Sequence, residues 1–473
     1  MTLSPLAPEW LAHPADANDL PGSVWPDGTQ RDASGQLCID GVSAVKIIER
    51  FGSPVYVIDE EHARLRARMI KTAFTAELAR IGTSAKIYYA AKAFLCTEVA
   101  RWVTEEGLGV DVCSGGELAV ALAAQVPPAR IGMHGNNKSI AEIDRAVAVG
   151  VGTIVIDSEI EISRVAEAAS RHGRTQAVRL RVNSGVHAHT HEFLATAHED
   201  QKFGVPLERA AFLVSKIRSH SSLSFLGLHC HIGSQIFGTD GFAESARRLL
   251  GVQAELLETG EVPELNLGGG FGIAYTVADD PTDIQEIARH IADIVAAECQ
   301  RLAIPIPVVA LEPGRFIIGG SGLTLYTVGT IKDVDVTLDS HQGTAVRKYV
   351  SVDGGMSDNA RPALYGADYS VRLANRSSNA DPGLVRVAGK HCESGDILVN
   401  AEYLPDDVTP GDILAIPATG AYCWSLSSNY NYLGRPPVVA VRNGAARLII
   451  RGETEEDLLS RDVGIDSANL GAS

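Results

Sequence analysis

The chain has 473 residues, more than one ordinary hydrophobic core organises, so two domains are expected. Apolar residues make up 45% of it and charged residues 21%, the balance of a folded soluble protein. A formal net charge of −17 disfavours nucleic acid and anionic membrane surfaces as partners. We expect no membrane span, because no apolar run is long enough, and a cytoplasmic location, because the first residues do not read as a signal peptide.

The cysteines and histidines give no clear sign of disulfide bonds or of a metal site. The seven cysteines are scattered, odd in number and free of CxxC pairs, so reduced thiols are expected. His187, His189 and His191 alternate in a polar stretch without nearby cysteines. That pattern is more typical of a solvated loop than of a zinc site, and we expect no metal.

The first segment of the chain, residues 1–58, leads into the apolar run VYVID at 55–59. This run is expected to be a strand, because its residues are β-branched, aliphatic or aromatic. It precedes the first helix of the central domain. We therefore expect the segment to contribute to the same domain as the C-terminal part of the chain.

The central part, residues 59–318, alternates short β-forming runs with amphipathic segments such as IAEIDRAVAVG and DIQEIARHIADIVAAECQRLA. Strands that alternate with helices form parallel sheets through right-handed crossovers. Eight such units predict a (β/α)8 barrel. The eight runs are KIYYA from Lys86, GVDVC from Gly109, IGMHG from Ile131, TIVID from Thr153, AVRLRV from Ala177, FLGLHCHIG from Phe225, ELNLGGG from Glu264 and VVALEPG from Val308.

Polar and glycine residues collect where these runs end. In a (β/α)8 barrel the carboxyl ends of the strands share one rim, and active sites lie there. Lys92, directly after KIYYAA, is therefore expected on the functional face rather than in a plain surface loop. The rim residues are Lys92, Cys113, Ser114, Asn136, Asp157, Asn183, His231, Gly268 to Gly270 and Glu312.

Residues 319–473 show a different pattern, in which short β-rich runs are separated by Gly, Pro and Asp turns. Examples are TLYTVGTIKDVDVTL, RKYVSVDGG, DILAIPATGAY and PPVVAVRNGAARLIIR. Few helical periods interrupt them, apart from a short terminal helix expected in ETEEDLLSRD. This part is predicted to form a second, mostly antiparallel, barrel-like β-domain.

Three features of the rim together point to a cofactor. The glycines of LGGGFG, from Leu267, would let backbone N–H groups approach a phosphate closely. LEPGRF, from Leu311, places a carboxylate and an arginine after the last strand, and phosphates often bind at the last two loops of such barrels. A lysine, a phosphate site and an acid on one rim suggest a pyridoxal phosphate enzyme. In HIGSQ, His231 could stack on the cofactor ring and Ser234 could reach its phosphate.

With these motifs the chain resembles the alanine-racemase-like, fold-type III pyridoxal phosphate decarboxylases. Any one of the motifs is unspecific, but all of them occur in the order that the family shows. The resemblance covers nearly the whole chain. It is carried by YYAAKAF, HIGSQ, LGGGFG, EPGR, GGMSDNARPALYGA, HCESGD and GAYCWS.

The resemblance implies pyridoxal 5'-phosphate as cofactor, with Lys92 as the lysine that holds it covalently. Glu312 would pair with the ring nitrogen, His231 would stack on the ring, and Cys392 would act as proton donor. These four are the implied catalytic residues. Further cofactor contacts are implied for Asp111, Ser234, Gly268, Gly269, Gly270, Gly314, Arg315 and Tyr422.

The nearest branch of this family converts meso-2,6-diaminopimelate to L-lysine and CO2, the last step of lysine biosynthesis. By resemblance, Arg361 and Tyr365 would bind the distal carboxylate and Glu393 the distal amine. Tyr422 is also a candidate substrate contact. Arg315 could serve either the phosphate or the substrate, and both readings stay open here.

The resemblance also implies an obligatory homodimer, because Cys392 and Glu393 would complete the site of the partner chain. Two alternatives remain. A decarboxylase of ornithine, arginine or a related polyamine precursor needs no cationic clamp for the substrate, so Arg361 disfavours it. A non-catalytic homologue is disfavoured because Lys92, Glu312 and Cys392 are all present.

Overall fold

The computed structural model describes residues 4–186, 202–338 and 343–464, which form two compact units. The barrel unit comprises Arg64–Gly272 and Pro281–Ile317, and the β unit comprises the described residues before and after it together with Ile273–Asp280. The boundaries expected from sequence lay at 58/59 and 318/319. The short segment Ile273–Asp280 is the main difference, since it interrupts the barrel in sequence but packs within the β unit.

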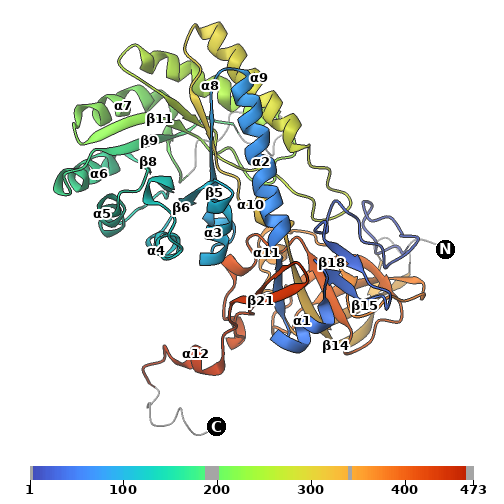
Figure 1. Ribbon diagram of the computed structural model, residues 1–473. Coiled ribbons are helices and arrows are strands. Elements are labelled where there is room, and N and C mark those ends of the chain that lie inside the picture. The colour runs from blue at the N-terminus through green and yellow to red at the C-terminus, as the bar shows by residue number, and fades with distance from the viewer. Residues whose placement is uncertain (1–3, 187–201, 339–342, 465–473) are drawn as a thin grey trace. The chain divides into compact units, whose positions relative to one another are not determined.

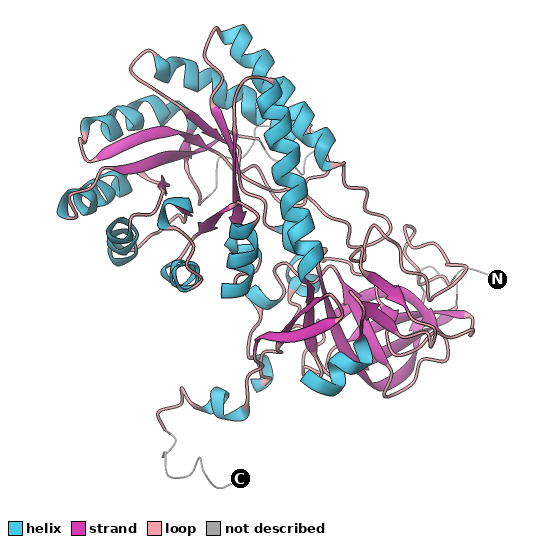
Figure 2. Ribbon diagram, viewed as in Figure 1, coloured by secondary structure: helices cyan, strands magenta, loops and turns pink. Residues whose placement is uncertain are grey.

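The barrel unit is built on eight parallel strands that close into a ring, which confirms the predicted (β/α)8 barrel. Each strand pairs with the next along the chain, and the last, β13, pairs with the first, β5. Helices in cyan surround these strands in Figure 2. The strands are β5 (Ala85–Ala90), β6 (Gly109–Val112), β7 (Ile131–Met133), β8 (Thr153–Ile156), β9 (Gln176–Asn183), β11 (Leu223–His229), β12 (Glu264–Asn266) and β13 (Val308–Leu311), with a short β10 (Val205–Pro206) beside β9.

The helices of the barrel alternate with its strands along the chain and lie around them (Figure 1). Their ends follow local sequence signals, as in α5, where Ser139 and Glu142 form a capping box and Gly150 ends the helix at φ 78°. The helices are α2 (Glu60–Arg80), α3 (Thr97–Glu105), α4 (Gly115–Ala123), α5 (Ile140–Val149), α6 (Glu159–Arg171), α7 (Ala210–Ser219), α8 (Asp240–Leu257), α9 (Ile284–Leu302) and the short α10 (Arg315–Ile318).

Two barrel strands end four residues earlier than the predicted runs. β11 ends at His229 and β12 at Asn266, although the predicted runs continued to Gly233 and Gly270. Glycines with positive φ follow both strands, for example Gly268 at φ 70°. Strand geometry requires negative φ, so the chain leaves the sheet there and forms loops at the rim.

The β unit contains a nine-stranded, mostly antiparallel sheet and a three-stranded sheet. Strand β4, which comes from the N-terminal segment, pairs with β14 and β20. Buried residues such as Tyr326, Val350 and Leu414 fill the core of the β unit. None of the described helices combines the length and apolarity needed to cross a bilayer. The elements are β1 (Thr29–Arg31), β2 (Leu37–Ile39), β3 (Val42–Ser43), α1 (Ala44–Phe51), β4 (Val55–Asp59), β14 (Gly322–Thr337), β15 (Thr344–Val352), α11 (Arg361–Tyr365), β16 (Arg372–Leu373), β17 (Pro382–Ala388), β18 (Ile397–Pro405), β19 (Ile413–Pro417), β20 (Val438–Arg442), β21 (Ala445–Ile450) and α12 (Glu455–Leu459).

Candidate active site

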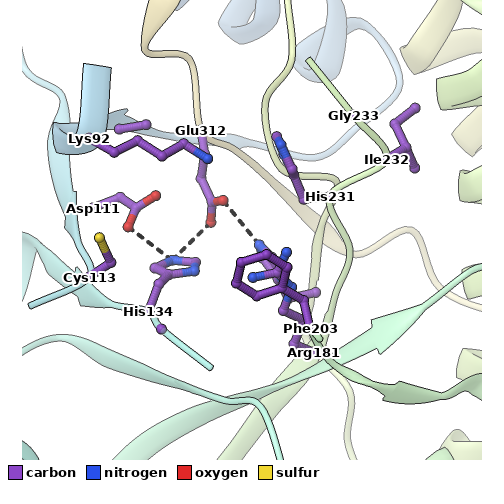
Figure 3. A pocket seen from close by; sticks show the side chains of 13 residues that line it. Lys92, Asp111, Cys113, His134, Arg181, Phe203, His231, Ile232, Gly233 and Glu312 are labelled. Carbon is purple, nitrogen blue, oxygen red and sulfur yellow. Dashed lines mark hydrogen bonds and ion pairs between the residues drawn. The ribbon is translucent and has the colours of Figure 1, made fainter. Parts of the chain in front are cut away.

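A cavity of about 340 Å³ lies at the carboxyl ends of the barrel strands (Figure 3). Its polar lining comes from residues that follow or end different strands, as expected of a (β/α)8 barrel. Parallel strands bring such residues to one rim even though they are far apart in the sequence. The charged and polar side chains that line it are Lys92, Asp111, Cys113, His134, Arg181, His229, His231 and Glu312.

Lys92 reaches the cavity from a single turn of 3-10 helix, Ala91–Ala93, that follows β5. The alanines on either side of it are buried, whereas Lys92 itself is exposed. Its long side chain therefore extends into the cavity, toward Glu312 and His231 (Figure 3). The backbone N–H of Ala90 donates to the carbonyl of Pro313 at 3.0 Å, which ties the lysine turn to the loop that carries Glu312.

Glu312 follows β13 and is 7% exposed. Three side chains donate hydrogen bonds to its carboxylate: Nδ2 of Asn266 to Oε1 at 2.6 Å, Nε2 of His134 to Oε1 at 3.2 Å and Nε2 of His229 to Oε2 at 3.0 Å. Burial alone raises the pKa of a carboxyl group, but the two histidines outweigh it and hold the pKa of Glu312 well below its usual range. Glu312 is therefore ionised.

Asp111 lies on β6, beside His134, with 3.5 Å between its Oδ1 and Nε2 of the histidine. Burial raises the pKa of Asp111 to about 7, with His134 opposing the rise and the charge of Glu312 adding to it. The cavity thus contains two acids with different protonation behaviour. Two neighbouring carboxyl groups with such different pKa values are common in active sites.

His231 lines the same cavity and carries a neutral ring. Burial and the charge of Lys92 hold the pKa of His231 well below its usual value. Its Nδ1 accepts a hydrogen bond from the backbone N–H of Gly269 at 3.3 Å, so the ring proton is on Nε2. A neutral imidazole fixed by its neighbour is suited to stacking on a flat aromatic ligand.

The glycine loop after β12 approaches neighbouring backbone too closely for any side chain. A Cβ added to Gly269 would lie 2.0 Å from the carbonyl oxygen of Glu312, and one on Gly270, at φ 115°, would lie 2.5 Å from that of Gly233. Nearby, Nη2 of Arg315 donates to Oγ of Ser234 at 2.9 Å. This combination of a compact glycine loop, a hydroxyl group and an arginine suits an anion such as a phosphate. Gly314 packs tightly too, since its Cβ would lie 3.0 Å from the carbonyl oxygen of Ala90.

In the β unit, Cys392 and Glu393 lie on an exposed turn. Oδ1 of Asn431 accepts hydrogen bonds at 3.1 Å from both the backbone N–H of Cys392 and Nδ1 of His391. On its other side, Nε2 of His391 accepts from Oγ of Ser357 at 2.8 Å. The turn is therefore fixed by side chains while the thiol itself is accessible.

Arg361 begins α11 and is only 6% exposed, so it is not a solvated surface arginine. Its guanidinium carbon lies 4.4 Å from the centre of the Tyr275 ring, and Nη1 donates to Oη of Tyr369 at 2.5 Å. Tyr365, at the other end of the helix, is 69% exposed. Tyr422 is half-buried and has φ 64°, a strained backbone for a tyrosine.

Sequence reasoning did not include His134, Arg181, Phe203 and His229 among the site residues, although all four line the cavity. A signal for His134 and His229 was present, since both lie toward the polar parts of predicted strand runs, IGMHG and FLGLHCHIG; in the structure the first directly follows β7 and the second ends β11. Arg181 lies inside β9, where its guanidinium packs 4.3 Å from the centre of the Phe203 ring. His187, His189 and His191, for which we expected no metal, lie outside the described residues.

His134, His229 and Glu312 also present ligand atoms within 4.8 Å of one another, close enough to surround a metal ion. Both histidines, however, direct Nε2 at an ionised carboxylate, whose oxygens can only accept hydrogen bonds. Each Nε2 must then carry a proton and has no lone pair for a metal. The cluster is better explained as a set of donors around Glu312.

Comparison with known protein families defines the class of the protein. The model of the pyridoxal binding domain of pyridoxal-dependent decarboxylases matches residues 64–319, which span the barrel. The chain is thus a pyridoxal phosphate-dependent decarboxylase, a carboxy-lyase. The cavity fits this cofactor, because it offers an accessible lysine, an ionised acid and a neutral imidazole.

Curated relatives narrow the class. The diaminopimelate decarboxylase of Mycobacterium tuberculosis is 51% identical over 452 residues, which cover 94% of this chain and 98% of that protein. That of Bacillus subtilis is 43% identical and covers 92% and 97%. The chain belongs to the diaminopimelate decarboxylase family. The crystal structure of the M. jannaschii diaminopimelate decarboxylase in complex with L-lysine has a TM-score of 0.85 and 32% identity, with 93% and 98% of the two chains covered.

Proposed function

We propose that this chain converts meso-2,6-diaminopimelate to L-lysine and CO2, with Lys92, Glu312, His231 and Cys392 as its catalytic residues. Full-length similarity to diaminopimelate decarboxylases supports the reaction. The observation that carries the assignment of residues is the accessible amine of Lys92, which shares one cavity with the buried, ionised Glu312. We expect that a chain with only one of these two residues would not catalyse decarboxylation.

Pyridoxal phosphate, when bound, supplies an electron-accepting ring that a protein lacks. In our assignment Lys92 would hold it covalently, Glu312 would accept a hydrogen bond from its ring nitrogen and His231 would stack on its ring. Its phosphate would be bound by Gly268, Gly269, Gly270, Gly314, Ser234 and Tyr422. Arg315 belongs with this group, because its hydrogen bond to Ser234 favours the phosphate over the substrate. Asp111 stands beside the Lys92 turn, on the neighbouring strand.

Cys392 is proposed to hold the proton that replaces CO2 on the reacting carbon. A thiol suits this task when it is accessible and held in place: Cys392 is exposed, and the contact of its backbone N–H with Asn431 holds the turn. Both Cys392 and Glu393 are exposed in the single chain. We propose a homodimer in which Cys392 of the partner subunit completes each site.

The distal carboxylate and amine of the substrate would be bound by Arg361, Tyr365 and Glu393. The two aromatic rings beside Arg361 fix its guanidinium in place, so little side-chain entropy remains to be lost on binding a carboxylate. Glu393 would pair with the distal amine. Because all seven cysteines are free thiols, we also propose a cytoplasmic location.

The substrate can be tested with purified holoenzyme by comparing kcat/KM for meso-diaminopimelate, ornithine, arginine and lysine. We expect meso-diaminopimelate to exceed each of the others by at least about 100-fold, because only it offers the distal carboxylate that Arg361 would bind. A preference for ornithine or arginine would replace this assignment with a polyamine-precursor decarboxylase. Binding of the cofactor without turnover of any of the four would instead support a non-catalytic homologue.

Replacing Arg361 with alanine should raise KM for meso-diaminopimelate about 10- to 100-fold and leave the cofactor absorbance unchanged. The loss corresponds to one charge-assisted arginine–carboxylate contact, about 1.5–3 kcal/mol. Steady-state kinetics of the purified variant measures it. Arg376, which pairs with Asp412 and Asp407, is a matched control, and its alanine variant should keep KM within about twofold. An unchanged KM in the Arg361 variant would exclude the contact.

A further inference from the structure

The carboxylate of Glu312 accepts from side-chain donors that belong to three neighbouring strands or strand ends. Three donors, from the ends of β7, β11 and β12, use three of the roughly four acceptor sites that a carboxylate has. One acceptor site is left for a further donor. Figure 3 shows the ion pairs of His134 with Asp111 and Glu312 as dashed lines on one side of this carboxylate.

His229 has a single possible arrangement of its proton. The ring is 1% exposed, and burial lowers the pKa of His229 to about 4 against the opposing effect of Glu312, so the ring is neutral. Its Nδ1 is buried and has no hydrogen-bond partner among the residues that the structure describes. Its one proton is therefore on Nε2, directed at Glu312. Leaving a buried ring nitrogen unpaired is costly, which indicates that the contact with Glu312 is the reason for the histidine.

His134 connects the two acids of the cavity. Its Nε2 is 3.2 Å from Oε1 of Glu312 and 3.5 Å from Oδ1 of Asp111. Its backbone N–H donates to the carbonyl of Val112 at 2.7 Å, which fixes the ring relative to the strand that carries Asp111. The Nε2 proton of His134 can therefore stabilise the charge on Glu312. Asp111, whose pKa is raised, is the weaker acceptor for that proton.

We propose that His134 and His229 are positioning residues for the decarboxylation, which keep Glu312 ionised and direct its remaining acceptor site at the ring nitrogen of the cofactor. An arginine in their place would bring a full positive charge and compete with that nitrogen for the carboxylate. Donors that leave one acceptor site of the carboxylate open stabilise the anion and keep that site for the ring nitrogen. The inference rests on the proposed function of Glu312 and extends it to two residues that do not contact the reacting atoms.

The test compares leucine and glutamine at position 229. Leucine fills the space of the ring without a donor, whereas glutamine can place an N–H near the position of Nε2. If the donor matters, H229L should weaken cofactor binding to the apoenzyme and lower kcat, each by about 10- to 100-fold, and H229Q should restore both to within about threefold. If the ring serves packing alone, the buried leucine should be the better replacement. H134L and H134Q form a second pair with the same expectation.

His172 offers a matched control, because its Nε2 contacts Oδ1 of Asp144 at 3.1 Å on the surface of the same barrel unit. H172L should leave cofactor affinity and kcat within about twofold. Thermal unfolding of each variant shows whether it is folded. Should H229L fail to fold, H229Q and H229N replace the comparison, since asparagine keeps the amide but is too short to reach Glu312.

A double-mutant cycle with E312Q separates this inference from the role of Glu312 itself. In the E312Q background, H229L should lower kcat by less than about threefold, because the carboxylate it serves is gone. The same factor in both backgrounds would overturn the inference and leave the role of Glu312 standing. If E312Q alone keeps wild-type kcat and cofactor affinity, the proposed role of Glu312 fails and the inference falls with it.

Discussion

Replacing Lys92 with alanine is expected to abolish decarboxylation while leaving the fold intact. The loss should be complete because a lysine amine that forms a covalent link to the cofactor has no substitute at this position. The fold should survive because the side chain projects into the cavity and the buried neighbours Ala91 and Ala93 are unchanged. Circular dichroism and thermal unfolding should therefore resemble those of the wild type, within a few degrees.

The covalent link can be located directly. Borohydride reduction of the wild-type holoenzyme followed by peptide mapping should find the reduced cofactor on Lys92. Lys86 lies near the start of β5, the strand that precedes the Lys92 turn, and forms an ion pair with Glu264. It serves as a control lysine. The Lys86→Ala variant should still become labelled on Lys92, and a label on any other lysine would refute the assignment.

Replacing Cys392 with alanine should lower kcat by about 100- to 10,000-fold, the range expected when a general acid is lost. Cofactor affinity should change little, because the thiol belongs to the β unit rather than to the barrel cavity. Stopped-flow measurements can separate loss of CO2 from the later proton transfer. A variant that releases CO2 at the wild-type rate but forms L-lysine slowly would match the expectation.

Mixed dimers test whether the site is shared. When subunits carrying Cys392→Ala are combined with subunits carrying Lys92→Ala, one of the two sites in each mixed dimer has both native residues. Such dimers should regain about half of the wild-type activity, although each parent is inactive or nearly so. Tagged subunits allow the mixed species to be purified. Verified mixed dimers without activity would show that each chain supplies its own Cys392.

Much of the fold could be predicted from the sequence because its signals are local. All eight barrel strands and the β-rich second unit were found from short apolar runs, and Lys92 was placed at the rim by its position after a strand. The ends of β11 and β12 were missed by four residues each. Apolar content continues past those strands, and after β12 the positive-φ Gly268, which the run of apolar letters does not reveal, turns the chain out of the sheet.

The environment of Glu312 could not be predicted in the same way. His134 and His229 are 95 positions apart, and only closure of the barrel brings both to one carboxylate. A histidine at a strand end can equally be a satisfied core residue. The orientation of the Arg361 side chain could not be predicted from the sequence either, because the two tyrosines that hold it, Tyr275 and Tyr369, belong to different segments. Long-range contacts decide what each of these residues can do.

The most direct test of the central claim is to measure the products formed from meso-diaminopimelate before and after borohydride reduction of the purified holoenzyme. The account predicts that untreated enzyme releases CO2 and L-lysine in equal amounts, and that reduction, which fixes the cofactor permanently to Lys92, stops both. Failure of cofactor-loaded enzyme to release CO2 from meso-diaminopimelate, or release that continues after complete reduction, would contradict it.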